Sequence, residues 1–199
     1  YRSGMNLDAL PKEVLQEIMK KKLFVTGGCG YVGSLMIQSF LDRYSVKNID
    51  TQWFGNKLKK NDDLINIEED IRNLSGEFID KDTYAVIHLA NIANDPSVEL
   101  DQTLSWEVNV LAAKTLIEES IKAGVKKFIY AASSSCYGLS DIKTSENVKI
   151  NIQHPYAFSK YVGEQAVLHW GKVYKIPTIS IRIFNAYGPR SRTTNVYGA

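Results

Sequence analysis

From residue 22 onward, the chain alternates short apolar runs with longer stretches of helical periodicity. The short runs are rich in β-branched and aromatic residues, which is typical of strands that are covered on both faces of a parallel sheet. The expected strands are residues 22–26, 46–50, 63–67, 84–90, 126–132 and 178–184. This alternation predicts parallel strands joined by crossover helices, and therefore an α/β fold.

Three stretches between these strands have the spacing of helices, namely residues 31–43, 99–123 and 156–174. In the second stretch, mostly apolar side chains recur on one stripe, and the stretch stops at Gly124, a favourable residue for a helix end. The stripe consists of Leu100, Leu104, Val108, Leu111 and Thr115. We expect residues 99–123 to form one helix with this stripe as its buried face.

The pattern indicates one main domain with a short extension before it. Residues 8–20 have the amphipathic pattern of a short helix, with Asp8 as a possible cap and Pro11 in the first turn. We assign residues 1–21 to an N-terminal extension that contains this helix, and residues 22–185 to a single domain. The sequence of that domain contains no internal repeat and no low-complexity tract.

Length and composition describe an ordinary folded domain. The chain has 199 residues, of which 44% are apolar and 23% charged, a balance that excludes a disordered chain. The formal net charge of +2 selects no partner. The lysines within residues 19–22 and 57–60 are expected to be solvated surface, so no nucleic-acid partner is expected.

The cysteines and the apolar segments bear on location. Cys29 and Cys136 are the only cysteines and lack the spacing of metal ligands, so no metal site is expected and both are interpreted as reduced thiols of a cytoplasmic protein. Residues 19–41 imitate a signal peptide, because lysines precede an apolar run. Four glycines interrupt the run and no cleavage site follows, so neither a signal peptide nor a membrane span is expected.

A glycine-rich turn directly follows the first expected strand. In TGGCGYVGS, Gly27, Gly30 and Gly33 recur at three-residue spacing, and a helix is expected to begin at about Tyr31. The order strand, glycines, helix brings bare backbone and a helix N-terminus to a pyrophosphate, whose negative charge the amide donors and the helix dipole favour. We therefore predict dinucleotide binding by Gly27, Gly30, Tyr31 and Val32.

Acidic residues after the second and third strands indicate which dinucleotide is bound. Asp50 ends the second strand, 23 residues after Gly27, where a carboxylate would accept hydrogen bonds from the adenosine ribose. It would repel the extra phosphate of NADP, and DTQWFGN contains no arginine to receive that phosphate, so NAD is favoured. Asp70 and Ile71 are expected to flank the adenine. A strand-end turn remains the alternative interpretation of Asp50.

One pair of side chains suggests proton transfer. Tyr156 and Lys160 lie one helical turn apart and therefore share a face, where the ammonium would lower the phenol pKa. A solvated tyrosine–lysine pair is the alternative interpretation. The run YAASSSCYG, residues 130–138, places hydroxyl groups at the carboxyl end of the fifth strand, where open α/β sheets bind ligands.

Together these motifs resemble the extended short-chain dehydrogenase/reductase family, in particular its NAD-dependent nucleotide-sugar epimerases and dehydratases. The resemblance extends from about Lys22 to Arg190. It rests on TGGCGYVGS, Asp50, DIR, VIHLA, EVNV, SSSCYG, PYAFSK and IRIFNAYGPR, in that order. It implies a Rossmann-like doubly wound parallel sheet that binds NAD. It also implies a smaller carboxy-terminal substrate domain that is largely missing from this chain, with residues 186–199 as its start.

The resemblance implies roles for individual residues. Tyr156 would be the acid/base, and Lys160 would lower its pKa and hold the nicotinamide ribose. Ser133 would hydrogen-bond the reacting hydroxyl, with Ser134 as the alternative because the serine triplet leaves an ambiguity of one position. Asn185 would contact the diphosphate of the substrate.

Further positions follow from the same resemblance. Leu89 and Ala90, at the end of VIHLA, are expected at the cofactor, and His88 is interpreted as structural. Asn109 matches an asparagine near the family's active site and is expected at the cofactor. A satisfied core amide is the alternative for Asn109.

The serine run also helps to distinguish between the reactions that members of this family catalyse. At the two positions after Ser133, where dehydratases of the family tend to carry acidic residues, this chain has Ser134 and Ser135, whose alcohols cannot act as acids or bases near neutral pH. Elimination is therefore disfavoured, and the leading hypothesis is an NAD-dependent nucleotide-sugar epimerase. A dehydratase or reductase of the same family, a simple alcohol or ketone reductase and a non-catalytic NAD-binding module remain open. The resemblance further implies a homodimer that pairs through residues 99–123 and 156–174.

Overall fold

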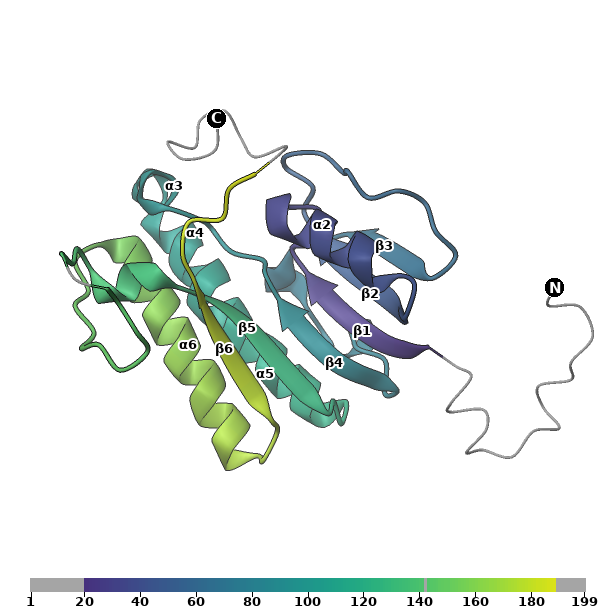
Figure 1. The fold of residues 1–199 in the computed structure, drawn as a ribbon. Coiled ribbons are helices and arrows are strands. Elements are labelled where there is room, and N and C mark those ends of the chain that lie inside the picture. The colour runs from purple at the N-terminus through teal and green to yellow at the C-terminus, as the bar shows by residue number, and fades with distance from the viewer. Residues whose placement is uncertain (1–19, 142, 189–199) are drawn as a thin grey trace, which may run out of the picture.

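The computed structural model describes residues 20–141 and 143–188. Within this part of the chain, helices and strands form one layered unit around a central sheet (Figure 1). The expected helix at residues 8–20 and most of the segment 186–199 lie outside the described residues.

A six-stranded, wholly parallel sheet forms the centre of the fold, with the strand order β3-β2-β1-β4-β5-β6. The strands are β1 (Lys21–Thr26), β2 (Tyr44–Asp50), β3 (Leu64–Glu68), β4 (Thr83–His88), β5 (Lys127–Ser133) and β6 (Thr178–Ile183). The chain runs outward from β1 through β2 and β3, then returns to β4 on the other side of β1. This reversal is the point at which open α/β sheets bind ligands, and the predicted fold class is confirmed.

Helices cover both faces of the sheet. The α-helices are α2 (Tyr31–Phe40), α3 (Asp95–Leu100), α4 (Gln102–Trp106), α5 (Ala113–Lys122) and α6 (Pro155–Val173), and η4 (Glu107–Ala112) is a π-helical turn. The short 3₁₀ turns are η2 (Ile71–Asn73), η3 (Gly76–Phe78) and η5 (Ser134–Tyr137). Phe24 packs with side chains of α5 and α6, whereas its neighbours Leu23 and Val25 pack with those of α2. The alternation of side chains along β1 therefore supplies two separate cores.

The expected single helix over residues 99–123 is wrong. The backbone is extended at Asp101, with φ −153°, and the Asp101 carboxylate accepts a hydrogen bond from the Leu104 backbone N–H at 2.8 Å, which begins a new helix. The π-helical turn η4 then rotates the following residues relative to a regular helix. As a result Leu100 is 88% exposed and Leu111 is 51% exposed. The buried positions are Ser105, Val108, Asn109, Val110, Ala112, Ala113, Leu116, Ile117 and Ser120.

The edge strand β6 is held on α6 by a buried carboxylate. Glu164 accepts hydrogen bonds from the Ser180 hydroxyl at 2.7 Å and from the Arg182 guanidinium at 3.1 Å. Arg182 also donates to the Tyr137 hydroxyl at 2.8 Å, which ties the strand to the turn after β5. These bonds fix the end of β6, from which the chain enters the site through Asn185.

Candidate active site

The glycine-rich turn between β1 and α2 is shaped by its lack of side chains. Gly27 has φ +76°, and a Cβ atom there would lie 2.5 Å from the backbone nitrogen of Ala90. A Cβ on Gly33 would lie 2.6 Å from the carbonyl oxygen of Gly27. Helix α2 begins after Gly30 with no side-chain cap and no acidic residue in its first turn. Its N–H groups are therefore suited to an anion.

A polar network lies directly beneath this turn, and the sequence reasoning missed it. Asn48 on β2 is fully buried; its side-chain oxygen accepts from the Gly28 N–H at 2.9 Å, and its amide donates to the Asn66 side-chain oxygen at 2.6 Å. The Cys29 thiol lies 3.6 Å from the Asn66 and Asn56 side-chain oxygens, and burial raises its pKa to about 11. The signal was that Asn48 lies two residues after Val46, on the same buried face of the strand.

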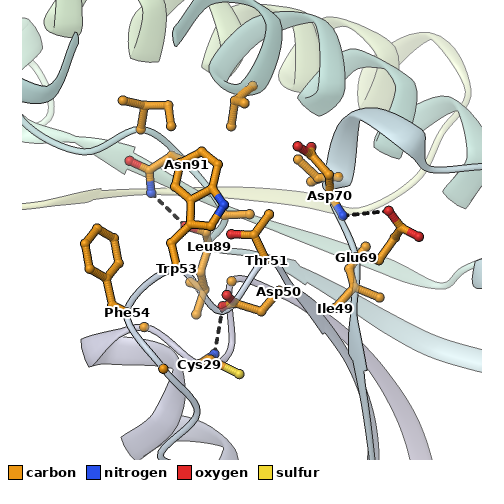
Figure 2. Close-up of a pocket in the computed structure, with 17 residues that line it drawn as sticks. Cys29, Ile49, Asp50, Thr51, Trp53, Phe54, Glu69, Asp70, Leu89 and Asn91 are labelled. Carbon is orange, nitrogen blue, oxygen red and sulfur yellow. Dashed lines mark hydrogen bonds between the residues drawn. The ribbon is translucent and has the colours of Figure 1, made fainter. Parts of the chain in front are cut away.

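A cavity of about 140 Å³ opens between this turn and the ends of β2, β3 and β4 (Figure 2). This cavity is lined by five residues that were predicted to contact the cofactor and that lie outside the glycine-rich turn: Asp50, Asp70, Ile71, Leu89 and Ala90. Gly27 and Gly30 line it as well. Tyr31 and Val32 are the first residues of α2, directly after Gly30, and do not line this cavity.

Two backbone donors orient the Asp50 carboxylate. The carboxylate accepts hydrogen bonds from the Cys29 N–H at 2.9 Å and from the Gln52 N–H at 2.7 Å, so it points toward the start of the glycine-rich turn (Figure 2). The pKa of Asp70 is lowered, chiefly by its hydrogen bond with Arg72. Trp53 and Phe54, on the loop after β2, also line the cavity and are 56% and 66% exposed. Sequence reasoning had not selected these aromatic residues.

Asn109 lies behind the loop that follows β4. Its side-chain oxygen accepts from the Ile92 N–H at 2.8 Å, and its amide donates to the Ile92 carbonyl and to the Ser159 hydroxyl, both at 3.1 Å. The side chain is almost fully buried and lines neither of the cavities described here. These contacts fit the alternative of a satisfied core amide, which positions the loop between β4 and α3.

A second cavity, of about 590 Å³, adjoins the first, because Asn91 lines both. It collects side chains that are far apart in the sequence, from the ends of β5 and β6 and from α6. The predicted residues that line it are Ser133, Ser134, Tyr156, Lys160 and Asn185. All residues predicted to carry the chemistry therefore lie around one cavity at the carboxyl edge of the sheet.

Tyr156 is surrounded by opposing influences. Burial raises its pKa, while hydrogen bonds from the Ser133 side chain and from the Asn94 backbone N–H lower it. The contact with Ser133 favours this residue over Ser134 as the partner of the phenol. The net direction is upward, so the expected lowering of the phenol pKa by Lys160 is wrong for this structure: desolvation, together with the negative charge of Asp95, outweighs the two hydrogen bonds.

Lys160 is buried at the base of the same cavity, and burial lowers its pKa to about 7. Its ammonium nitrogen lies 4.6 Å from the centre of the Tyr130 ring. Near neutral pH the charged and neutral forms of this side chain therefore coexist, unlike those of an exposed lysine. His88, interpreted as structural, is buried, with its Nδ1 atom 2.7 Å from the Thr26 hydroxyl.

A carboxylate that the sequence reasoning missed also lines the second cavity. Asp95 follows Asn94, which has φ +69°, and begins α3. The signal was the sequence NDP after the fourth strand, since the loops at the carboxyl ends of parallel strands carry ligand-binding groups. The inference from Ser134 and Ser135 concerned only the two positions after Ser133, and Asp95 places a carboxylate elsewhere in the lining of the same cavity.

Two other features are absent from the described part of the chain. Residues 20–141 and 143–188 contain no group of three or more histidine, cysteine, aspartate or glutamate side chains arranged to hold a metal ion. In the same residues, no helix combines the length and the apolar character needed to cross a membrane.

Comparisons with known proteins bear on this arrangement. A family model described as the NAD dependent epimerase/dehydratase family matches residues 23–198. The human dTDP-D-glucose 4,6-dehydratase is 30% identical over 183 residues, which cover 85% of this chain and 52% of that protein. The residues matched by the family model, 23–198, include every residue that lines the two cavities.

Solved structures are similar in fold as well. The UDP-N-acetylglucosamine 4-epimerase from Methanobrevibacter ruminantium, in complex with UDP-N-acetylmuramic acid, gives a TM-score of 0.84 at 28% identity, over 92% of this chain and 60% of that one. The UDP-glucuronic acid 4-epimerase from Bacillus cereus, in complex with NAD, gives 0.77 at 29% identity, over 86% and 58%. The chain thus spans little more than half the length of these proteins.

Proposed function

Because the chain belongs to the NAD dependent epimerase/dehydratase family, we propose that it binds NAD and inverts a hydroxyl-bearing carbon of a nucleotide sugar. The observation that carries this proposal is the pair of adjoining cavities. One lies against a glycine turn and a helix N-terminus, and the other gathers Ser133, Tyr156 and Lys160.

The residues present fit NAD. Gly27 has no side chain, so only its backbone stands where a pyrophosphate would approach. The first N–H groups of α2 are not capped by a side chain. Asp50 is held by two backbone donors, at the end of β2 where the adenosine ribose would lie. Its negative charge disfavours the additional phosphate of NADP. Asp70, Ile71, Leu89 and Ala90 would complete the cofactor contacts.

Bound NAD would supply the acceptor, and later the donor, of the hydride at the sugar carbon. Tyr156 takes the proton from the sugar hydroxyl as the hydride leaves, and returns a proton when the hydride is added to the opposite face. Ser133, which is hydrogen-bonded to the phenol, orients the hydroxyl and supports the phenolate. Lys160 adds positive charge when protonated and would hold the nicotinamide ribose.

Substrate binding and assembly are parts of the same proposal. Asn185 and Ser134 line the second cavity and would contact the nucleotide sugar, and residues 186–199 would begin a substrate domain. A homodimer would form through the helices within residues 99–123 and 156–174. Trp106 and Phe158, one from each of these segments, support it. Their rings stack with 6.0 Å between their centres, and both side chains remain partly exposed. Free, buried Cys29 and Cys136 fit a cytoplasmic location.

The test begins with acid denaturation of the purified protein and identification of the released nucleotide by mass spectrometry, where NAD is expected. UDP-glucose, UDP-N-acetylglucosamine and UDP-glucuronic acid are then added to the NAD-loaded protein. An epimerase gives a product of unchanged mass with a transient absorbance of reduced cofactor, whereas a dehydratase gives a product lighter by one water. A binding module gives neither.

The variant Tyr156→Phe is expected to lose turnover by more than about a hundredfold, because general acid/base catalysis contributes about 10²–10⁴. Its affinity for NAD should stay within about threefold, since phenylalanine keeps the packing of the ring. Tyr161→Phe, one position beyond Lys160 on α6, is the matched control. Normal turnover by Tyr156→Phe would rule out the mechanism.

A further inference from the structure

Asp95 is a carboxylate that the proposed mechanism does not use. It lines the second cavity together with Ser133, Tyr156 and Asn185. Its Oδ1 atom is inaccessible to solvent and has no hydrogen-bond partner. An unpaired buried acceptor costs free energy, about 1–3 kcal/mol for a typical group, and an atom that water cannot reach meets a sugar hydroxyl only after the carboxylate turns toward the cavity.

The backbone around Asp95 holds it in place. Asn94 adopts φ +69°, which is uncommon for a residue other than glycine, and its side chain accepts a hydrogen bond from the Ser97 N–H at 3.1 Å. Pro96 follows and restricts the backbone of Asp95. Strained positions of this kind are concentrated at ligand-binding sites.

The same segment touches the proposed acid/base. The Asn94 N–H bonds to the Tyr156 hydroxyl, and the charge of Asp95 is close enough to raise the Tyr156 pKa, after burial and the Ser133 hydrogen bond in importance. Among the ion pairs of the described residues, none involves Asp95. The carboxylate therefore lines the cavity of the reacting position without a salt bridge to any described residue.

We propose that Asp95 determines specificity by accepting a hydrogen bond from a hydroxyl or amide N–H of the sugar, next to the carbon that Tyr156 serves. This inference rests on the proposed function. A carboxylate can only accept hydrogen bonds, so it selects sugars that present donors and repels sugars that carry a negative charge. The site therefore prefers neutral nucleotide sugars over uronic acid derivatives.

The experiment measures the dissociation constants of UDP-glucose, UDP-N-acetylglucosamine and UDP-glucuronic acid by calorimetry, on the NAD-loaded chain. The wild type is expected to bind the neutral sugars more tightly. Asp95→Asn removes the charge but keeps the shape, and is expected to weaken the neutral sugars about 10-fold or more, because hydrogen bonds to charged groups are the stronger ones. The preference over UDP-glucuronic acid should shrink by at least as much.

Two further variants keep the test sharp. Glu99→Gln removes an exposed carboxylate from the same helix outside the cavity and should leave the preference unchanged. Asp95→Ser removes the carboxylate without adding bulk and should repeat the loss seen with Asp95→Asn. An unchanged affinity for NAD shows that each variant is folded.

The outcomes separate this inference from the proposed function. If the wild type binds these sugars but Asp95→Asn and Asp95→Ser keep its preference within twofold, Asp95 does not set specificity and the proposed function still stands. A wild type that prefers UDP-glucuronic acid overturns the inference in the same way. A wild type that binds NAD but none of the sugars overturns both.

Discussion

The asparagine pair beneath the phosphate turn offers the sharpest test of how the strands support the site. Asn48 and Asn66 lie directly opposite each other in the register of β2 and β3. In Asn48→Ala, the Gly28 N–H loses its acceptor at 2.9 Å and the Asn66 oxygen loses its donor at 2.6 Å. The buried Gly28 N–H is then left unpaired, and the partly buried Asn66 oxygen keeps only the Cys29 thiol, at 3.6 Å.

The expected cost follows from these two groups. At about 2 kcal/mol for the unpaired Gly28 N–H and about 1 kcal/mol for the Asn66 oxygen, which keeps a weak thiol donor, Asn48→Ala should lower the free energy of unfolding by about 3 kcal/mol. For a chain of this size, that loss lowers the melting temperature by roughly 6–12 °C. The affinity for NAD should fall as well, because Gly28 is part of the turn that would meet the pyrophosphate.

The assay is urea unfolding followed by circular dichroism, for Asn48→Ala, Asn66→Ala and the double variant. Asn66→Ala in the background of Asn48→Ala removes an oxygen that has already lost its Asn48 donor, so the double variant should cost about 1–2 kcal/mol less than the sum of the single variants. Asn147→Ala, at an exposed position, should stay within about 0.5 kcal/mol of the wild type. A cost below about 1 kcal/mol for Asn48→Ala, with additive single variants, would refute the reasoning.

Two further changes test the electrostatics and the turn. Burial lowers the pKa of Lys160 from 10.5 to about 7, so the unfolded chain binds the extra proton between these values and stability should fall as pH drops from 10.5 to about 7. Lys160→Met should remove this dependence of the free energy of unfolding on pH, whereas Lys172→Met, at an exposed position, should keep it. Equal slopes in the wild type and Lys160→Met would contradict this. Gly27→Ala should lower the free energy of unfolding more than Gly124→Ala does. Of the two variants, only Gly27→Ala should abolish NAD binding, which calorimetry measures. Both glycines have φ near +75°, but only Gly27 has backbone within 4 Å of a new Cβ; comparable losses would argue against the clash.

Much of the fold could be predicted because its signals are local. Each of the six expected strands is present, with bounds that differ by at most two residues, since apolar runs between turns report burial directly. The helix expected over residues 99–123 failed for a local reason with a tertiary consequence. Asp101 caps a new helix, and the π-helical turn moves Leu111 to the surface. Periodicity assumes an unbroken helix and cannot register either event.

The sequence by itself determined the parallel sheet, the glycine turn and the identity of the groups that could do chemistry. Only the tertiary structure decided which of them meet. It brought Asp95 from the end of β4 to the cavity of Tyr156, and it paired Asn48 with Asn66 beneath the turn. It also reversed the expected direction of the Tyr156 pKa, because desolvation depends on everything that surrounds the phenol. Propensity and spacing act over a few residues, whereas burial and cross-strand contact are properties of the assembled sheet.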